Sequence, residues 1–107
     1  MTEYSVTFTP EAEEQLAELY HYIAEKASPT SALRYTNAIV DFCASMKAFP
    51  HRGVARDDIR PGLRISNYKK NAIVAFAVND VELTVTIIGV FYGGRNYADI
   101  IAVPPKT

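Results

Sequence analysis

The sequence predicts an α+β domain in which a hairpin of two helices covers one face of a β-sheet. In the first half of the chain, apolar residues recur three and four positions apart over two stretches, which is the period of amphipathic helices. In the second half, short apolar runs rich in β-branched residues are separated by turn signals, which is typical of strands. Helices followed by a group of strands indicate a layer of helices on an antiparallel sheet.

The first two elements are a strand and a helix. Residues 3–8 alternate apolar and polar side chains, which predicts a half-buried strand. Thr9 can cap a helix, and Pro10 suits the first helical position because its fixed φ is helical and its missing N–H is not needed there. The helical spacing of apolar residues then continues, so we expect this helix to end near Ala27.

The second helix starts with the same signals, Ser28 and Pro29, and Pro50 is predicted to end it. Residues 72–78 are almost all apolar, which predicts a central strand covered on both faces. The expected order is therefore β-α-α-β-β-β, a strand, a helical hairpin and a three-stranded antiparallel meander. The three strands of the meander are predicted at Leu63–Tyr68, Ala72–Val78 and Leu83–Tyr92.

The composition is that of a globular domain, with 49% hydrophobic and 21% charged residues. We expect a single domain over residues 1–107, in which residues 96–107 form a tail. The sequence shows neither a signal-peptide pattern nor an apolar run of the roughly 18–20 residues that a membrane helix needs. Cys43, the only cysteine, is predicted in the core, and with two histidines it is too small a set for a structural zinc site. These features predict a cytoplasmic protein without cofactor, metal ion or membrane contact.

Charge is unevenly distributed along the chain, although the net charge is only −1. Residues 1–28 hold six acidic side chains and one basic one, whereas residues 47–70 hold seven basic and two acidic ones. One surface is therefore expected to be acidic and another basic. The modest net charge argues against a nuclease, because affinity for nucleic acid rises with the number of phosphates that a protein neutralises.

Arginine recurs every fourth residue in the segment before the first strand of the meander, at Arg52, Arg56, Arg60 and Arg64. Prolines and glycines interrupt the segment, so these arginines do not form a stripe on one helix. The segment has the pattern P-x-x-G-x-x-R-x-D-x-x-PGLR, and the last strand is followed by two glycines and Arg95. With these motifs the chain resembles the RelE/ParE superfamily of type II toxin–antitoxin toxins, and within it the ParE branch.

The resemblance covers roughly residues 3–100 and implies the fold predicted above. It also implies alternative activities, because ParE-like members poison DNA gyrase whereas RelE-like members cut mRNA on the ribosome. A ParE-like toxin would have no catalytic centre of its own and would be neutralised by a ParD-like antitoxin, whose tail folds on the toxin. When free, such a toxin could form a homodimer. A further alternative is an inactive member retained for plasmid or locus stability through antitoxin binding alone.

Most residues that a RelE-like nuclease would use are missing from the sequence. By resemblance, such an enzyme places basic residues on the strand after the loop, at the start of the central strand and after the last strand, where they stabilise charge on the phosphate. Here Ser66 stands where a second basic residue is expected, and the central strand is preceded by Asn71. Arg95 matches the last of these positions. The tail tyrosine of a nuclease would fall near Ile101, although Tyr97 lies close by.

The candidate target-binding residues would form a compact cationic patch where one strand starts and another ends: Arg64, Arg95, Tyr92, Tyr97, Arg60 and Arg56. An arginine binds phosphate or carboxylate through two parallel hydrogen bonds, and the tyrosine rings would stack on a partner or cover the sheet edge. Arg95 is the favoured member, because two neighbouring glycines allow a partner to approach. Alternatively, Arg64 pairs with Asp57 or Asp58 and fixes the loop to the sheet. The other loop arginines are expected to be solvated or paired with the same aspartates.

The candidate antitoxin-binding residues are apolar positions of the helical hairpin: Leu16, Tyr20 and Ile23 on the first helix, or Leu33 and Val40 off the main stripe of the second. An exposed apolar groove of this kind typically marks a protein interface. The alternative is that all five side chains belong to the core.

Overall fold

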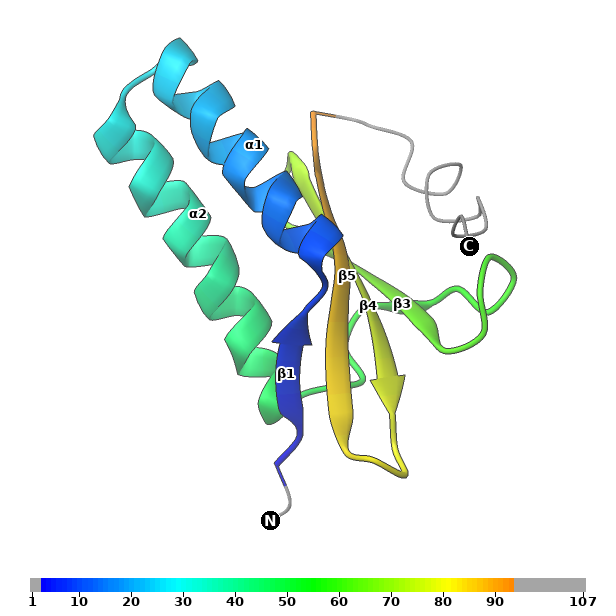
Figure 1. Cartoon of the computed structure of the whole chain (residues 1–107). Helices are drawn as coiled ribbons and strands as arrows, with labels where there is room; N and C mark the ends of the chain where they lie inside the picture. The colour runs from blue at the N-terminus through cyan, green and yellow to red at the C-terminus, as the bar shows by residue number, and fades with distance from the viewer. Residues whose placement is uncertain (1–2, 94–107) are drawn as a thin grey trace.

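The computed structural model describes residues 3–93 of the chain, so the predicted tail at 96–107 lies outside the described residues. Two helices lie side by side on one face of a twisted sheet, as Figure 1 shows. The α+β class and the predicted order of the longer elements are confirmed. The elements are β1 (Ser5–Phe8), α1 (Pro10–Lys26), α2 (Pro29–Ala44), the 3₁₀ turn η1 (Ser45–Lys47), β2 (Val54–Ala55), β3 (Leu63–Tyr68), β4 (Ala72–Asn79) and β5 (Thr84–Tyr92).

The sheet has five strands in the order β1-β5-β4-β3-β2, and it is mixed rather than antiparallel. The meander from β3 to β5 is antiparallel, as predicted, but β1 runs parallel to β5. The helical hairpin causes this difference, because it carries the chain over the sheet before the meander begins. The two-residue strand β2, which pairs antiparallel with β3, was not predicted because two residues show no alternation.

Both helices start at the predicted residues. The Thr9 hydroxyl oxygen accepts a hydrogen bond from the Ala12 N–H at 3.1 Å, and the Ser28 hydroxyl oxygen accepts one from the Ser31 N–H at 3.1 Å. The prediction that the second helix continues to Pro50 is wrong. Helix α2 ends at Ala44, and the chain tightens into η1 before it reaches the proline.

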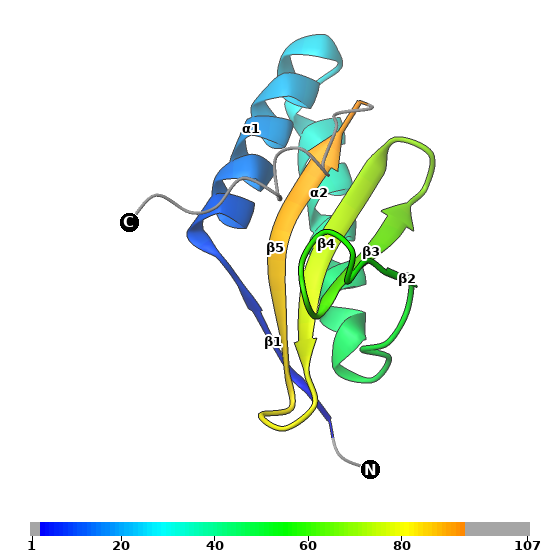
Figure 2. The same cartoon turned by 90° about the vertical axis from the view of Figure 1, so that its right-hand side faces the viewer.

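The core has two parts, one on each face of the sheet. The larger part lies between the helices and the sheet and is centred on β4 and β5 side chains such as Phe76 and Ile87. The smaller part contains Leu63, Ala75 and Phe91, with Ile59 of the β2–β3 loop packed against it. Figure 2 shows this loop over the face of the sheet that is opposite the helices. Strand β4 is therefore central and covered on both faces, as its apolar sequence predicts.

Candidate functional site

Arg64 of β3 holds the loop between η1 and β2 by donating hydrogen bonds to backbone carbonyl groups of that loop. Its guanidinium donates hydrogen bonds to the carbonyl oxygens of Arg52 at 2.9 Å, His51 at 2.7 Å and Gly53 at 3.3 Å. The sequence-based alternative, an ion pair with Asp57 or Asp58, is therefore wrong in its partners. Arg64 does fix the loop to the sheet, but its acceptors are neutral.

Gly53 allows the loop between η1 and β2 to approach β3 closely beside Arg64. Its φ is +74°, in the left-handed region that side chains other than that of glycine rarely adopt. A Cβ atom at this position would lie 2.2 Å from the carbonyl oxygen of Ile65, which is a backbone atom and cannot swing away. The loop after η1 therefore requires glycine here.

The loop between β2 and β3 is held by its own polar side chains. Arg56 and Asp58 form a two-bond ion pair, with both N···O distances at 3.0 Å, and the hydrogen bond from Arg56 lowers the pKa of the Asp58 carboxyl. Asp57 instead accepts a hydrogen bond from the Gly62 N–H at 2.9 Å. Arg60 is exposed and makes no salt bridge to a described residue. The prediction of pairing with the aspartates is thus confirmed for Arg56.

Arg52 is neither freely solvated nor paired with an aspartate. Its guanidinium lies 4.8 Å from the ring centre of Phe42, a cation–π contact, and donates a hydrogen bond to the Ser45 hydroxyl at 3.2 Å. Arg52 therefore connects the loop to the end of α2, a role that the arginine spacing alone does not indicate.

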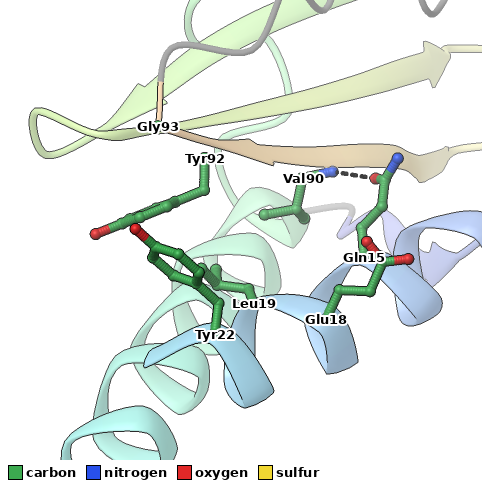
Figure 3. Close-up of a pocket in the computed structure, with 7 residues that line it drawn as sticks. All are labelled: Gln15, Glu18, Leu19, Tyr22, Val90, Tyr92 and Gly93. Carbon is green, nitrogen blue, oxygen red and sulfur yellow. Dashed lines mark hydrogen bonds between the residues drawn. The ribbon is translucent and has the colours of Figure 1, made fainter. Parts of the chain in front are cut away.

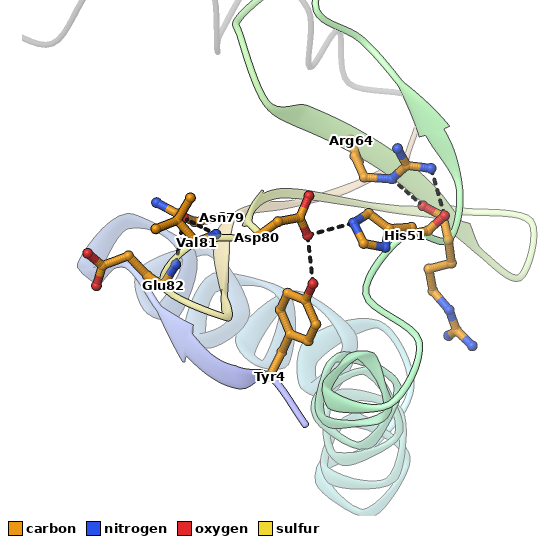
Figure 4. A network of polar contacts seen from close by, with 8 residues as sticks. Tyr4, His51, Arg64, Asn79, Asp80, Val81 and Glu82 are labelled. Carbon is orange, nitrogen blue, oxygen red and sulfur yellow. Dashed lines mark hydrogen bonds and ion pairs between the residues drawn. The ribbon is translucent and has the colours of Figure 1, made fainter. Parts of the chain in front are cut away.

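A polar network joins three separate segments at the end of the sheet where β3 starts, as Figure 4 shows. The Asp80 carboxylate accepts hydrogen bonds from the Tyr4 hydroxyl at 2.6 Å and from His51 Nε2 at 2.8 Å. The bond from Tyr4, followed by that from His51, holds the pKa of Asp80 below its usual range, and the same bond raises the pKa of Tyr4. The network thus links the residue just before β1, the loop after η1 and the β4–β5 turn.

The predicted compact patch does not form between Arg64 and Tyr92. Strands β3 and β5 run in the same direction, so the start of one and the end of the other lie at opposite ends of the sheet. Arg64 lies in the row of Ile87, five residues before Tyr92 on β5, which corresponds to about 16 Å along the strand. Two other predicted members of the patch, Arg95 and Tyr97, lie outside the described residues.

Tyr92 belongs to an aromatic cluster between the sheet and the helices. Its ring centre lies 5.9 Å from that of Tyr22 and 5.8 Å from that of Tyr35. Tyr92 is half-buried, whereas Tyr22 is 50% exposed. The end of β5 therefore presents a partly covered aromatic surface toward α1.

The five apolar residues singled out on the hairpin have different environments. Leu16 and Ile23 are partly buried against the main core, and Tyr20 is half-buried with its ring against that of His21. On α2, Leu33 is 54% exposed and Val40 is 39% exposed. The two α2 positions are thus accessible to a partner, whereas Leu16 and Ile23 contribute to the fold.

A pocket of about 380 Å³ lies between α1 and the end of β5, as Figure 3 shows. Gln15 Oε1 accepts a hydrogen bond of 2.7 Å from the Val90 N–H, so α1 is tied to the strand at one end of the pocket. No motif in the sequence indicates this site. Gln15 has no distinctive neighbours in sequence and Tyr22 lies outside the apolar stripe of α1. The pocket is lined by Gln15, Glu18, Leu19, Tyr22, Val90, Tyr92 and Gly93.

Residues 3–93 contain no group of three or more histidine, cysteine or acidic residues that could hold a metal ion. Cys43 is fully buried, as predicted for a core residue, and its burial raises the pKa of the thiol to about 12. Such a thiol is not a nucleophile near neutral pH. No helix in this part of the chain is long and apolar enough to cross a membrane.

Three solved structures share this fold, although their sequences are only distantly similar. The chromosomal ParDE toxin–antitoxin system from P. aeruginosa has a TM-score of 0.73 and 19% identity, over 86% of this chain and 98% of that chain. The RelBE2 toxin–antitoxin complex from Mycobacterium tuberculosis has a TM-score of 0.62 and 21% identity, over 85% of this chain and 99% of that chain. A mutant of the E. coli toxin RelE, in complex with an antitoxin peptide, has a TM-score of 0.52 and 16% identity over the whole of both chains. The fold is therefore that of the RelE/ParE class of toxins.

The family model for the ParE toxin of the type II toxin–antitoxin system, parDE, matches residues 6–97. This range includes the helical hairpin and every strand of the meander. The chain belongs to the ParE toxin family, the branch that its loop and glycine–arginine motifs indicate. No curated protein sequence matches it as a relative.

Proposed function

We propose that this protein inhibits DNA gyrase by binding it, as a toxin without a catalytic centre, and that a ParD-like antitoxin neutralises it. The observation that carries the proposal is the family match over residues 6–97, which is to the ParE branch of the superfamily. In the P. aeruginosa ParDE system, a protein of the same fold is part of a toxin–antitoxin system. The target, gyrase with its DNA, would be met in the cytoplasm.

The arrangement of β3 and β4 supports a binding toxin over the alternative ribonuclease. Cleavage of RNA needs cations that are free to stabilise the charge that develops on the phosphate. The guanidinium of Arg64 is instead occupied by three backbone carbonyls of the loop. Ser66 and Asn71, at two positions where a RelE-like nuclease would place basic residues, carry no charge.

The proposed target-binding surface is smaller than the sequence suggested. The guanidinium of Arg64 is hydrogen-bonded to carbonyl groups of the loop before β2, and Arg56 is paired with Asp58. We keep Arg95 and Tyr97 as candidates from the sequence motifs. Arg60 remains a candidate because it is exposed on the β2–β3 loop.

The direct test is a gyrase assay with purified components. Toxin is added to gyrase, ATP and relaxed plasmid, and both supercoiling and the linear DNA trapped by denaturation are measured. We expect supercoiling to fall and linear DNA to accumulate, and Arg95→Glu to weaken both effects. Glu13→Lys, a charge reversal on α1, is the matched control and should leave both effects unchanged.

Primer extension on mRNA in a translation extract tests the alternative. Codon-specific cleavage that Arg95→Ala abolishes would refute the proposal and assign a RelE-like activity. If a folded protein that still binds the antitoxin neither inhibits supercoiling nor causes cleavage of mRNA, it is an inactive member of the family.

A further inference from the structure

Helix α2 and the end of strand β3 carry a row of aromatic rings. The ring centre of Tyr68 lies 5.1 Å from that of Phe42 and 6.0 Å from that of Tyr35. Strand β2 pairs with β3 only at Arg64 and Ile65, so the part of β3 that bears Tyr68 lies at the edge of the described sheet. This edge is on the other side of β4 from the pocket between α1 and β5.

Two cations lie against rings of this row. The Arg52 guanidinium lies 4.8 Å from the Phe42 ring centre, and Lys69 Nζ lies 5.7 Å from the Tyr68 ring centre. Arg52 also donates a hydrogen bond to the Ser45 hydroxyl at 3.2 Å, which uses only part of the donor capacity of a guanidinium. The rings therefore hold two positive charges in defined positions at the same edge.

Two further cations extend this region. Lys70 follows Lys69 in the β3–β4 turn and is exposed. Arg34 is also exposed, and it precedes Ser45 on α2 by about three helical turns. Residues separated by whole turns share one face of a helix, so Arg34 lies on the face of α2 that is turned toward β3.

The region retains a net positive charge. We define the α2–β3 cationic surface by its four cations and the two rings that hold them: Arg34, Phe42, Arg52, Tyr68, Lys69 and Lys70. None of these cations forms a salt bridge with a described residue. Asp41 lies on the same face of α2 as Arg34 and offsets only one of the four positive charges.

Lys69 has a backbone conformation that is unfavourable for lysine. Its φ is +55°, in the left-handed region where a Cβ atom crowds the backbone carbonyl oxygen. Glycine adopts this conformation without that cost, so the turn would be more stable with glycine. A strained residue on an exposed turn indicates a role other than stability, and the feature that lysine adds here is its charge.

The distribution of the cations favours a nucleic-acid backbone over an acidic protein segment. Arg34 and the Ser45 hydroxyl that binds Arg52 are about 16 Å apart along α2, at about 1.5 Å of rise per residue. Duplex DNA carries one phosphate charge for about every 1.7 Å of its axis, so phosphates are available along the whole of this distance. A protein segment would need acidic side chains at matching positions. Arginine binds phosphate through two parallel hydrogen bonds, and lysine binds it as a point charge.

We propose that the α2–β3 cationic surface binds the sugar–phosphate backbone of duplex DNA. Arg52 and Lys69 are held in place for phosphates by their rings, and Arg34 and Lys70 extend the contact. The assignment of this duplex to the DNA that gyrase holds rests on the proposed function, whereas the binding of phosphate rests on the cations. The net charge of −1 provides no long-range attraction, so binding to free DNA is weak and the contact matters when gyrase presents the duplex.

The test measures binding of the full-length toxin to a fluorescent duplex of about 20 base pairs by anisotropy, over a series of salt concentrations. We expect a Kd of about 10⁻⁴ M near physiological salt. A plot of log K against log salt should have a slope between about −2 and −4, because each neutralised phosphate contributes about 0.9. A glutamate-rich peptide is the second probe. Tighter binding of this peptide than of the duplex would overturn the choice of DNA and assign an acidic protein to the surface.

Lys69→Gly separates binding from stability. The substitution removes both the charge and the unfavourable φ, so the variant should resist urea at least as well as the parent. It should bind the duplex about tenfold more weakly at low salt, with a slope smaller by about one. Lys70→Gln should have the same effect on binding. Lys26→Gln is the matched control, because Lys26 Nζ lies 6.0 Å from the Tyr22 ring centre on the α1 side, and it should bind within about twofold of the parent.

The gyrase assay distinguishes failure of this inference from failure of the proposed function. Lys69→Gly and Lys70→Gln should trap less linear DNA than the parent. If both variants bind the duplex and trap linear DNA as well as the parent does, the inference is wrong and gyrase inhibition stands. Affinity that does not change with salt would also overturn the inference. If the duplex is bound through Lys69 but gyrase is unaffected, the proposed function is wrong and phosphate binding at this surface stands.

Discussion

The arginine-rich loop and the end of β5 differ in how their polar groups are used. In the loop, the charged side chains that dominate the sequence bind the protein itself: Arg64 binds carbonyl groups, and Arg56 binds Asp58. At the end of β5, the sequence shows only apolar residues and glycines, but the backbone of Tyr92 has groups that face no described strand. The region richest in charged residues is thus largely structural, whereas at Tyr92 the sequence drew attention to the side chain and the structure draws attention to the backbone.

This difference has a simple physical origin. Every residue has a backbone carbonyl. An arginine that binds carbonyl groups therefore needs no acidic partner, and no residue type in the sequence identifies its acceptors. Equally, an unpaired N–H at a sheet edge depends on where the neighbouring strand ends. Neither property can be read from residue types, because the first depends on the path of the segment before β2 and the second on the register of the strands.

The largest effect is expected at Gly53, which the loop requires. Gly53→Ala places a Cβ atom 2.2 Å from the Ile65 carbonyl oxygen at a φ of +74°, so the free energy of unfolding should fall by about 3 kcal/mol. Gly62→Ala is the control, because its φ is +80° but its Cβ atom would have no atom nearer than 4.0 Å. It should lose only about 1 kcal/mol in urea titration. Equal losses would mean that the loop can move away from β3.

Arg64 tests whether the loop is structural or target-binding. Arg64→Lys keeps the charge but cannot reproduce the fork that reaches the His51 and Arg52 carbonyls, so we expect a loss of about 2 kcal/mol. Gyrase inhibition, measured at a temperature where the variant is folded, should be retained. A variant that is as stable as the parent but does not inhibit gyrase would show that Arg64 belongs to the target-binding surface.

Gln15 tests the opposite region. Gln15→Leu removes the acceptor of the partly buried Val90 N–H, and the free energy of unfolding should fall by about 1 kcal/mol. Gln15→Glu retains an acceptor oxygen at the same distance from the backbone and should lose less. If the two variants are equally stable by urea titration, water replaces the side chain and the edge of β5 is more open than this hydrogen bond indicates.

Local signals in the sequence are sufficient for the main elements. The Thr9 and Ser28 caps, each followed by proline, predict both helix starts, and the apolar run at 72–78 predicts the central strand. The helix caps and the apolar run are determined by residues that are adjacent in sequence. The parallel pairing of β1 with β5 joins Ser5 to Thr84, and no local pattern contains that contact.

The candidate site is less predictable for the same reason. The position of Arg64 was identified, but its partners were not, because they are backbone atoms of the loop. The prediction of a compact patch that includes Arg64 and Tyr92 was wrong. Strands β3 and β5 run in the same direction, so the start of β3 lies at the opposite end of the sheet from the end of β5. The exposure of Leu33 and Val40 fits their position off the main apolar stripe of α2.

The smallest expected effect concerns Asp80, whose network closes the loop side of the sheet. Hydrogen bonds from Tyr4 and His51 lower the folded-state pKa of Asp80, so its contribution to stability is fully present above the unfolded pKa of about 3.9 and is lost as pH falls through the lower folded value. The pKa of Tyr4 is raised by the same hydrogen bond, so that part of the contribution is present below about pH 10 and is lost above it. Asp80→Asn should therefore be slightly less stable than the parent at neutral pH, and the difference should shrink as pH falls below about 4. Asp57→Asn, which affects a separate hydrogen bond to the Gly62 N–H, is the control for a general effect of removing a carboxylate. A difference for Asp80→Asn that persists undiminished at pH 3 would show that the turn, rather than the charge on Asp80, stabilises this end of the molecule.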